Sequence, residues 1–277
     1  MDLIKKYDIS SGSCELQGVR STMEDTHVCL DYFPPPMGQL SASYYGIYDG
    51  HGGFFTSSLL KKILHKTICE RQEYKEGQIL PALTAAYAET DSTILIESQN
   101  RSFQDGSTSA SLLVVDGKFY AANVGDSEIM LISVSKQGHI TPHLVSYPHK
   151  ATDKNEQFRI SSIGGKIFLN RVFGTLAVTR AFGDFKYKRP RNPEDYITSL
   201  PFITSGKLEN DVLYAVLACD GLFDVLTYQE IADLTHRSFQ KGNMPSAVAK
   251  ELAEYAVNVL GTTDNVTVIV VKLDWIT

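Results

Sequence analysis

The amino-acid sequence predicts an α+β fold, a layered α-β-β-α sandwich in which two mainly antiparallel sheets are flanked by pairs of helices. Short runs rich in valine, isoleucine, tyrosine and phenylalanine follow one another as hairpins, which is typical of antiparallel strands. Amphipathic stretches interrupt these runs in pairs, so a parallel sheet built from alternating strands and helices is not expected. No repeat or long flexible linker divides the chain, and we therefore expect one domain over residues 1–277.

The first half of the chain is expected to form three strands and then two helices. The strands occupy β-branched and aromatic runs at Cys14–Val19, Thr26–Phe33 and Ser43–Tyr48. Apolar residues then recur at helical spacing within Leu59–Ile68 and Ile79–Ile94. This spacing predicts two amphipathic helices after the third strand.

The second half returns to strands and closes with two more helices. Strands are expected at 109–115, 118–124, 128–134, 166–169, 176–178, 212–218 and 266–273. The dipeptide Asp116-Gly117 is a typical two-residue hairpin turn between the first two of these. Thr227 and Glu230 form a capping box that begins one helix, and Pro245 begins another that Gly261 ends.

The composition excludes several classes of protein. With a net charge of -6, the chain lacks the clustered Lys and Arg that neutralise nucleic-acid phosphates, so no nucleic-acid partner is expected. One short basic cluster is interpreted as a solvated loop, although it could select acidic or phosphorylated partners: Lys186, Lys188, Arg189 and Arg191. No apolar run approaches the roughly 20 residues that span a bilayer, and the first residues do not resemble a secretory signal. We expect no membrane association and a cytoplasmic location, with the nucleus as the alternative.

The four cysteines are widely spaced and form no Cys-x-x-Cys pair, which argues against a zinc site. Reduced thiols in a reducing compartment fit this spacing. Cys219 is expected to be a buried strand residue.

Acidic residues stand at the ends of apolar strands. Asp49 follows YYGIY, Asp220 follows LYAVLAC, and Asp264 precedes NVTVIVV. If the last of these strands runs antiparallel to the other two, the three carboxylates meet at one end of the sheets. Asp126 after FYAANVG and the pair Glu24-Asp25 before THVCL have similar positions.

Carboxylates gathered beside buried strands raise one another's pKa unless cations neutralise them. Oxygen ligands with few histidines favour Mg or Mn, and several acids suggest more than one ion. Two such ions can hold a phosphoryl oxygen and activate a water. The alternative is structural, because Asp-Gly is a common turn dipeptide that occurs four times, and Asp105-Gly106 is ambiguous. Spacing alone leaves both interpretations open, and it assigns no function to His51 or Arg20.

Eight segments, in order, resemble the motif series of the metal-dependent type 2C protein serine/threonine phosphatases, the PPM family. They are VRSTMEDTH, YYGIYDGHGG, DGSTSASLLVV, ANVGDSEIML, RISSIGGKI, RVFGTLAVTRAFGDFKYK, LACDGLFDV and DNVTVIVV. The series runs from about residue 13 to residue 273. Eight motifs in the family's order form a specific signal, whereas any one of them would be weak.

The resemblance implies a cleft at one end of the sheets that holds two Mg or Mn ions. Asp49 matches the family's bridging ligand, and Gly50 matches the ligand that binds through its backbone carbonyl. Asp220 and Asp264 match the remaining direct carboxylates.

The other motif residues take supporting roles by the same resemblance. Glu24 matches the acid that holds the second ion through water, and Asp25 supports it in the same motif. Asp126 matches the acid of a possible third, weaker metal site. Arg20 matches the residue that binds the substrate phosphate, and His51 matches the proposed general acid.

The implied activity is hydrolysis of phosphoserine and phosphothreonine in protein substrates by direct attack of a metal-bridging hydroxide. No phosphoenzyme is expected, because no cysteine lies in a Cys-x5-Arg phosphate loop. The chain is expected to be a monomer. Two alternatives stay open: a catalytically weak or dead member that binds phosphoproteins as a regulator, and a phosphatase for small phosphorylated molecules.

Four residues depart from the family pattern. Glu128 stands where arginine is usual, Pro148 where aspartate is usual, Phe173 where asparagine is usual and Phe223 where tryptophan is usual. Pro148 and Phe173 lie within residues 147–175, where the family carries a variable flap beside the cleft. Substrate preference and third-metal binding are the properties that these departures would alter.

Overall fold

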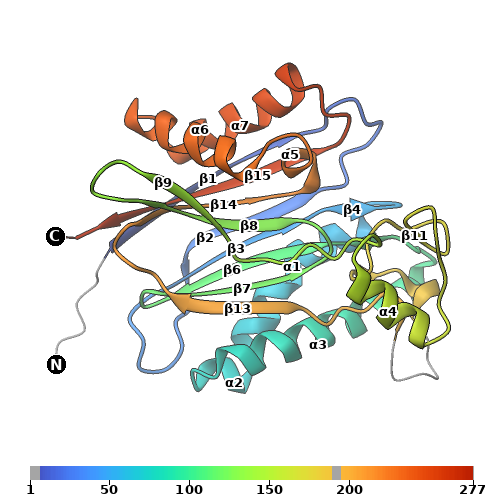
Figure 1. Ribbon diagram of the computed structural model, residues 1–277. Helices are drawn as coiled ribbons and strands as arrows, with labels where there is room; N and C mark the ends of the chain where they lie inside the picture. The colour runs from blue at the N-terminus through green and yellow to red at the C-terminus, as the bar shows by residue number, and fades with distance from the viewer. Residues whose placement is uncertain (1–6, 189–194, 277) are drawn as a thin grey trace.

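The computed structural model describes residues 7–188 and 195–276, and it contains two five-stranded antiparallel sheets that pack face to face (Figure 1). One sheet consists of β1 (Tyr7–Leu16), β15 (Val266–Trp275), β14 (Val212–Ala218), β8 (Glu128–Val134) and β9 (Ile140–Leu144), in that spatial order. The other consists of β13 (Phe202–Lys207), β7 (Lys118–Val124), β6 (Ser109–Val115), β3 (Ala42–Tyr48) and β2 (Thr26–Phe33). The predicted α-β-β-α sandwich is confirmed.

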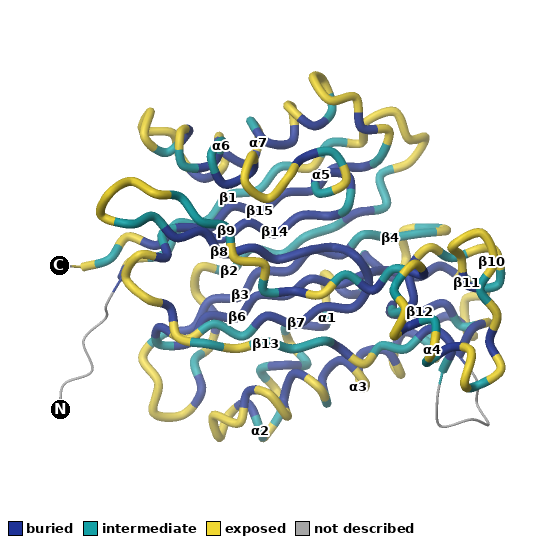
Figure 2. The backbone as a smooth tube through the Cα atoms, in the orientation of Figure 1, coloured by how far each residue is buried: buried dark blue, intermediate teal, exposed yellow. Residues whose placement is uncertain are grey.

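Helices cover the outer face of each sheet. The second sheet is covered by α1 (Phe55–Glu70), α2 (Gln72–Lys75) and α3 (Ile79–Arg101), and the first by α6 (Tyr228–Gln240) and α7 (Pro245–Glu254). Three apolar cores result, one between the sheets and one under each helical layer. Figure 2 shows the buried backbone concentrated in these layers, with exposed segments at the loops and outer helix faces.

The best-predicted elements are those with strongly apolar sequences. The strands β2, β6, β7 and β8 have the bounds that the sequence predicts, and the capping box of α6 is present, with the Thr227 side chain accepting from the Glu230 N–H. The segment 255–259 continues α7 as a single π-helical turn before Gly261.

Polar sequences account for the misplaced elements. The first strand was expected at 14–19 but spans Tyr7–Leu16, because its polar run YDISSGSCEL pairs along its whole length with β15. The strands β9 and β13 and the helix α4 (Lys154–Ser162) were not predicted, since none carries a clear apolar period. The expected strand at 176–178 forms only isolated bridges.

The segment that includes the predicted flap forms a small substructure beside the sandwich, at the right of Figure 1. It contains α4, the hairpin β10 (Ile167–Phe168) and β11 (Arg171–Val172), and a small apolar cluster of its own. Phe173 takes a left-handed φ of 49°, a conformation that asparagine adopts more easily than phenylalanine. Its ring packs on Tyr187 and Tyr196 at centroid distances of 5.9 and 4.9 Å, which offsets that strain.

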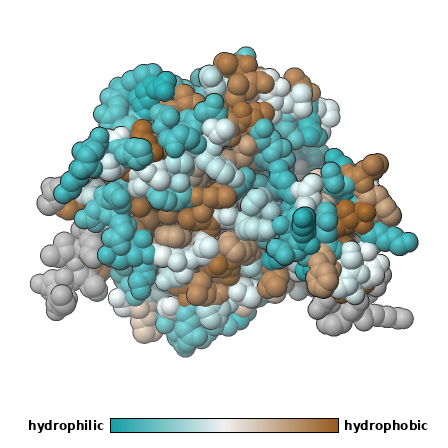
Figure 3. Space-filling view, viewed as in Figure 1, coloured by the Kyte–Doolittle hydropathy of each residue, from teal (hydrophilic) through white to brown (hydrophobic). Residues whose placement is uncertain are grey.

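Apolar groups gather at the surface of this substructure. Figure 3 shows brown residues at the right of the view, over the region of the β10–β11 hairpin. Phe168 and Leu169 of that hairpin are both exposed. No helix in the described part of the chain is long and apolar enough to cross a bilayer.

Candidate metal centre and active-site cleft

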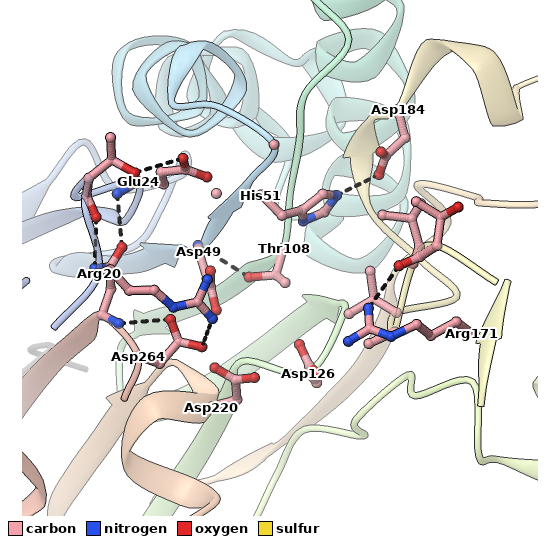
Figure 4. A pocket seen from close by; sticks show the side chains of 18 of the residues that line it. Arg20, Glu24, Asp49, His51, Thr108, Asp126, Arg171, Asp184, Asp220 and Asp264 are labelled. Carbon is pink, nitrogen blue, oxygen red and sulfur yellow. Dashed lines mark hydrogen bonds and ion pairs between the residues drawn. The ribbon is translucent and has the colours of Figure 1, made fainter. Parts of the chain in front are cut away.

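A cleft of about 620 Å³ opens at one end of the two sheets, between the sandwich and the flap substructure. Eight of the nine site residues predicted from the sequence line it: Arg20, Glu24, Asp49, Gly50, His51, Asp126, Asp220 and Asp264. All of these except Gly50 are labelled in Figure 4. Asp25 is the ninth; it is buried and is not among the residues that line the cleft. The cleft also contains residues that the sequence did not single out, Thr108, Arg171, Asp184 and Asn265.

Strand directions bring the acids together. Asp49 directly follows β3, and Asp220 begins the short helix α5 (Asp220–Phe223) after β14. β14 and β15 are antiparallel, with Ala218 opposite Val268, so the end of one lies beside the start of the other and beside Asp264. Asp126 lies in the turn between β7 and β8 at the same end. The proposed meeting of strand ends is confirmed.

The gathered carboxylates hold protons more tightly than isolated ones. Burial, followed by the charges of Asp25, Asp220, Asp126 and Asp264, raises the pKa of Asp49 well above its usual value. Burial and the neighbouring acids raise the pKa of Asp220 to about 8, and burial raises that of Asp126. A divalent cation would relieve this repulsion.

Asp25 is almost fully buried and lies beside Asp49 in the interior. Its Oδ2 accepts a hydrogen bond of 2.8 Å from Thr267 Oγ1, whereas its Oδ1 has no partner among the described residues. Ligand atoms of Asp25, Asp49 and Cys219 all lie within 4.8 Å of one another. Burial raises the pKa of Asp25 to about 6. Asp25 therefore has one buried oxygen atom that can accept another donor, such as a metal-bound water. Cys219 is fully buried, as predicted, and directly follows β14.

The loop that carries Glu24 is fastened to the glycine turn after Asp49. Glu24 Oε2 accepts from the Gly53 N–H at 3.1 Å, and its carbonyl oxygen accepts from Ser57 Oγ at 2.5 Å. A Cβ at Gly50 would lie 2.5 Å from that carbonyl oxygen, so the close approach requires glycine. Asn265, which the sequence did not single out, holds the same loop by accepting from the Glu24 N–H at 3.0 Å.

Arg20 lies at the rim of the cleft. Its guanidinium donates to Asp264 Oδ2 at 2.7 Å, and the Arg20 side chain is 57% exposed. The residue expected to bind phosphate therefore contacts a residue expected to bind metal (Figure 4).

His51 lies on the opposite side of the carboxylate group and pairs with Asp184. The distance between His51 Nε2 and Asp184 Oδ2 is 2.8 Å. Burial lowers the pKa of His51, but the charge and hydrogen bond of Asp184, together with the charges of Asp126 and Asp105, raise the pKa overall. Asp184 lies in the quoted motif TRAFGDF, yet no pattern within that motif distinguishes it as a histidine partner.

Two Asp-Gly dipeptides have structural roles. The carboxylate of Asp105 is buried and accepts from the Phe55 N–H at 2.7 Å and from Thr56 Oγ1 at 2.8 Å, so it anchors the first turn of α1. Asp116-Gly117 forms the predicted β6–β7 hairpin turn, with both residues at positive φ. These two cases show that the dipeptide alone does not identify a metal ligand.

Of the basic cluster, the structure describes Lys186 and Lys188, and only Lys186 is exposed as the sequence suggested. Lys188 is buried and forms an ion pair of 2.5 Å with the buried Asp91, while Lys186 is exposed and lines the cleft. Arg189 and Arg191 lie outside the described residues. The interpretation is wrong for Lys188, because α3 supplies a carboxylate that sequence spacing could not reveal.

Two departures from the family pattern contact the same residue. The buried carboxylate of Glu128 accepts from the Tyr228 hydroxyl at 2.8 Å. The ring of Phe223 lies 5.8 Å from the Tyr228 ring, centroid to centroid. Glu128 and Phe223 therefore both contact Tyr228, next to α5.

Comparison with known proteins agrees with this architecture. The family described as "Protein phosphatase 2C" matches residues 9–266. The chain is 40% identical to "Protein spalten" of Dictyostelium discoideum over 283 residues, which cover 98% of this chain and 28% of that protein. It is 33% identical to "Probable protein phosphatase 2C T23F11.1" of Caenorhabditis elegans, over 95% of this chain and 74% of that one. The chain therefore spans well under half of the first relative and most of the second.

Solved structures share the fold. The structure titled "Crystal structure of serine-threonine phosphatase 2C from Toxoplasma gondii" has a TM-score of 0.82 at 20% identity. The match covers 97% of this chain and 95% of that one. At this identity the likeness concerns the fold alone, whereas the family match and the curated relatives concern the sequence. Together they show that this chain belongs to the protein phosphatase 2C family.

Proposed function

We propose that this chain is a Mg- or Mn-dependent protein serine/threonine phosphatase that hydrolyses phosphoserine and phosphothreonine without a phosphoenzyme. The observation that carries the proposal is the cleft itself, where carboxylates with raised pKa values face a guanidinium and a histidine. Membership of the protein phosphatase 2C family supports the same reaction.

The residues in the cleft fit divalent cations. All the side-chain donors in the acidic group are carboxylate oxygens, which hard cations prefer, and Asp25 Oδ1 is a buried acceptor without a partner among the described residues. We assign Asp49, the Gly50 carbonyl, Asp220 and Asp264 as the ligands of two ions. When bound, such ions lower the pKa of a coordinated water and neutralise charge on the phosphoryl oxygens.

Two further acids belong to this assignment. Glu24 would act through a water, with Asp25 supporting it from the interior. Asp126 would hold a weaker third ion, as the resemblance to the family implies, and it stands on the flap side of Asp220 in the close-up (Figure 4).

The chain's own cationic groups supply the remaining steps. Arg20 would bind the phosphate of the substrate, because a guanidinium offers paired donors to phosphoryl oxygens. His51 would donate a proton to the serine or threonine oxygen as it leaves. The flap residues 147–175 would shape the approach of the phosphoprotein, since Arg171 and Thr175 line the cleft.

The test is an assay of the purified chain on a phosphothreonine peptide and on para-nitrophenyl phosphate, with Mn, with Mg and with chelator. We expect metal-dependent turnover of both substrates and its loss in Asp220→Ala. Asp233→Ala, on the exposed face of α6, is the control and should retain activity. Turnover that persists in chelator or in Asp220→Ala would overturn the proposal, and peptide binding without turnover would favour the regulator instead.

A further inference from the structure

A small three-stranded sheet beside the cleft joins segments that are far apart in the sequence. It consists of β12 (Phe182–Gly183), β5 (Gly106–Ser107) and β4 (Gly50–His51), in that order. Gly106 in the middle strand is paired with His51 on one side and with Gly183 on the other. The residue after Gly183 is Asp184, so this pairing brings the Asp184 carboxylate to the His51 ring.

Several contacts fix the Asp184 carboxylate in place. The residue is only 2% exposed, and its backbone has a left-handed φ of 51°. Its N–H donates to the Asp105 carbonyl at 3.0 Å, and its own carbonyl accepts from the Tyr187 N–H at 2.8 Å. A non-glycine residue in this strained conformation persists only where the surrounding contacts require it.

The pair also requires glycine at position 106. A Cβ there would lie 2.3 Å from Asp184 Oδ2 and 2.4 Å from His51 Nε2. These distances are far shorter than any van der Waals contact, so a larger residue would displace one side chain or the other. The strands β4, β5 and β12 can therefore bring His51 and Asp184 into contact only because residue 106 has no side chain.

A second anchor holds the Asp184 segment against α3. The Gly183 N–H donates to Asp91 Oδ1 at 2.9 Å, and Lys188 Nζ bridges Asp91 Oδ2 and the Ala181 carbonyl. Asp91 and Lys188 are both buried. The turn that carries Asp184 is therefore attached to a long helix at both of its ends.

The bond to Asp184 leaves the other ring nitrogen available. For Nδ1 of His51, the described part of the structure records no hydrogen-bond partner, and the residue lines the cleft. In Figure 4, Asp184 lies on the far side of the His51 ring from Asp49 and Asp220.

We propose that Asp184 is a positioning residue for His51, which holds Nε2–H so that Nδ1 points at the oxygen of the departing serine or threonine. This inference rests on the proposed phosphatase function. In the reaction, the oxygen of a water bonds to phosphorus and the water releases a proton to solvent, as the bond from phosphorus to the substrate oxygen breaks. The substrate oxygen keeps the electron pair of that bond and takes the proton from Nδ1, and the ring is reprotonated from solvent. Gly106 makes this orientation sterically possible.

Kinetics with two leaving groups test the role. Asp184→Ala should lower kcat on a phosphothreonine peptide by about 10- to 100-fold, and by a much smaller factor on para-nitrophenyl phosphate, whose leaving group needs little protonation. The KM for the peptide should change little, since the Asp184 carboxylate is buried and bonded to His51. Asp184→Asn keeps an acceptor oxygen and should recover part of the loss, and Gly106→Ala should reproduce the pattern of Asp184→Ala. Equal slowing of both substrates would overturn the proposal.

A double-mutant comparison separates positioning from general damage to the fold. In a His51→Ala background, adding Asp184→Ala should cause no further loss on the peptide, because the residue acts only through the ring. Losses that multiply would contradict the proposal. The control is Glu15→Gln, which removes another carboxylate–histidine pair, with His27, outside the cleft. It should leave the ratio of the two substrate rates unchanged.

Failure of the proposed function can be recognised separately. If the wild-type chain turns over neither substrate with Mn or Mg, the phosphatase proposal fails while the hydrogen bond can still be measured. The ¹⁵N NMR shifts of the His51 ring in metal-free protein should then show a proton held on Nε2 in the wild type. A mixture of tautomers is expected in Asp184→Ala, and identical ring spectra would overturn the positioning role.

Discussion

The guanidinium of Arg20 lies 2.7 Å from the carboxylate of Asp264, although the two residues are 244 positions apart in the sequence. Their side chains are 57% and 34% exposed, so solvent screens the ion pair and its contribution is about 0–1 kcal/mol. A pair this weak exchanges easily for other partners. The phosphate of a substrate and a metal ion are the partners proposed for the two groups.

Replacing Arg20 should separate phosphate binding from metal binding. Arg20→Ala is expected to raise the KM for a phosphothreonine peptide about tenfold or more, because paired donors to the phosphate are lost. The affinity for Mn, measured by calorimetry, should stay the same or rise, since Asp264 is released. Arg101→Ala, which breaks an exposed pair with Glu97 on α3, is the control and should change neither value. Weaker Mn binding with an unchanged KM would contradict the assignment.

The metal-free protein should lose stability as the pH rises from about 4 to about 8. Asp220, with a pKa raised to about 8 by burial and neighbouring acids, keeps a proton in the folded chain that the unfolded chain releases. The folded state therefore binds more protons in this window, and the free energy of unfolding falls with pH. Asp25, with a pKa of about 6, adds to the lower part of the window.

Urea unfolding in chelator at pH 5 and at pH 8 measures this effect. The midpoint should be lower at pH 8, and both Mn and Asp220→Asn should reduce the difference between the two values. A midpoint in chelator that increases from pH 5 to pH 8 would show that folding does not raise the pKa values of these acids.

Gly221 should be essential to the metal centre because of its surroundings. A Cβ at this position would lie 2.1 Å from the Asn265 carbonyl oxygen, between the segments that carry Asp220 and Asp264. Gly221→Ala is expected to weaken Mn binding at least tenfold and to destabilise the fold by about 1–3 kcal/mol. The control is Gly242→Ala, which introduces strain at a positive φ in open space and should lower stability without weakening Mn binding. Intact Mn binding in Gly221→Ala would refute the prediction.

The buried pair between Lys188 and Asp91 should contribute far more than an exposed one when a partner is removed. Asp91→Ala leaves an ammonium buried without its counter-charge and is expected to destabilise the protein by about 3–5 kcal/mol. Glu254→Ala breaks an exposed pair with Lys250 and should cost less than about 1 kcal/mol. Chemical denaturation of both variants decides the matter, and similar losses would show that the Lys188 ammonium finds another partner or reaches solvent.

Local patterns were sufficient for much of the fold. The strands β6 and β7 could be predicted to the residue, because apolar runs and the Asp116-Gly117 turn define them without help from distant contacts. The helix α4 and the strand β13 could not, since their polar sequences become regular only when they pack on the flap cluster and on β7.

The sequence by itself determined that acids stand at strand ends, and it brought Asp49, Asp220 and Asp264 to one end of the sheets only on the condition that the last strand runs antiparallel to the other two. The tertiary structure decided that condition, because β14 and β15 pair antiparallel although helices separate them in the sequence. Only the tertiary structure decided which charged side chains pair with one another. The pairs Arg20 with Asp264, His51 with Asp184 and Lys188 with Asp91 join distant segments. Each pair forms only when distant segments pack together, and a hydrogen bond formed through space leaves no period or spacing in the chain.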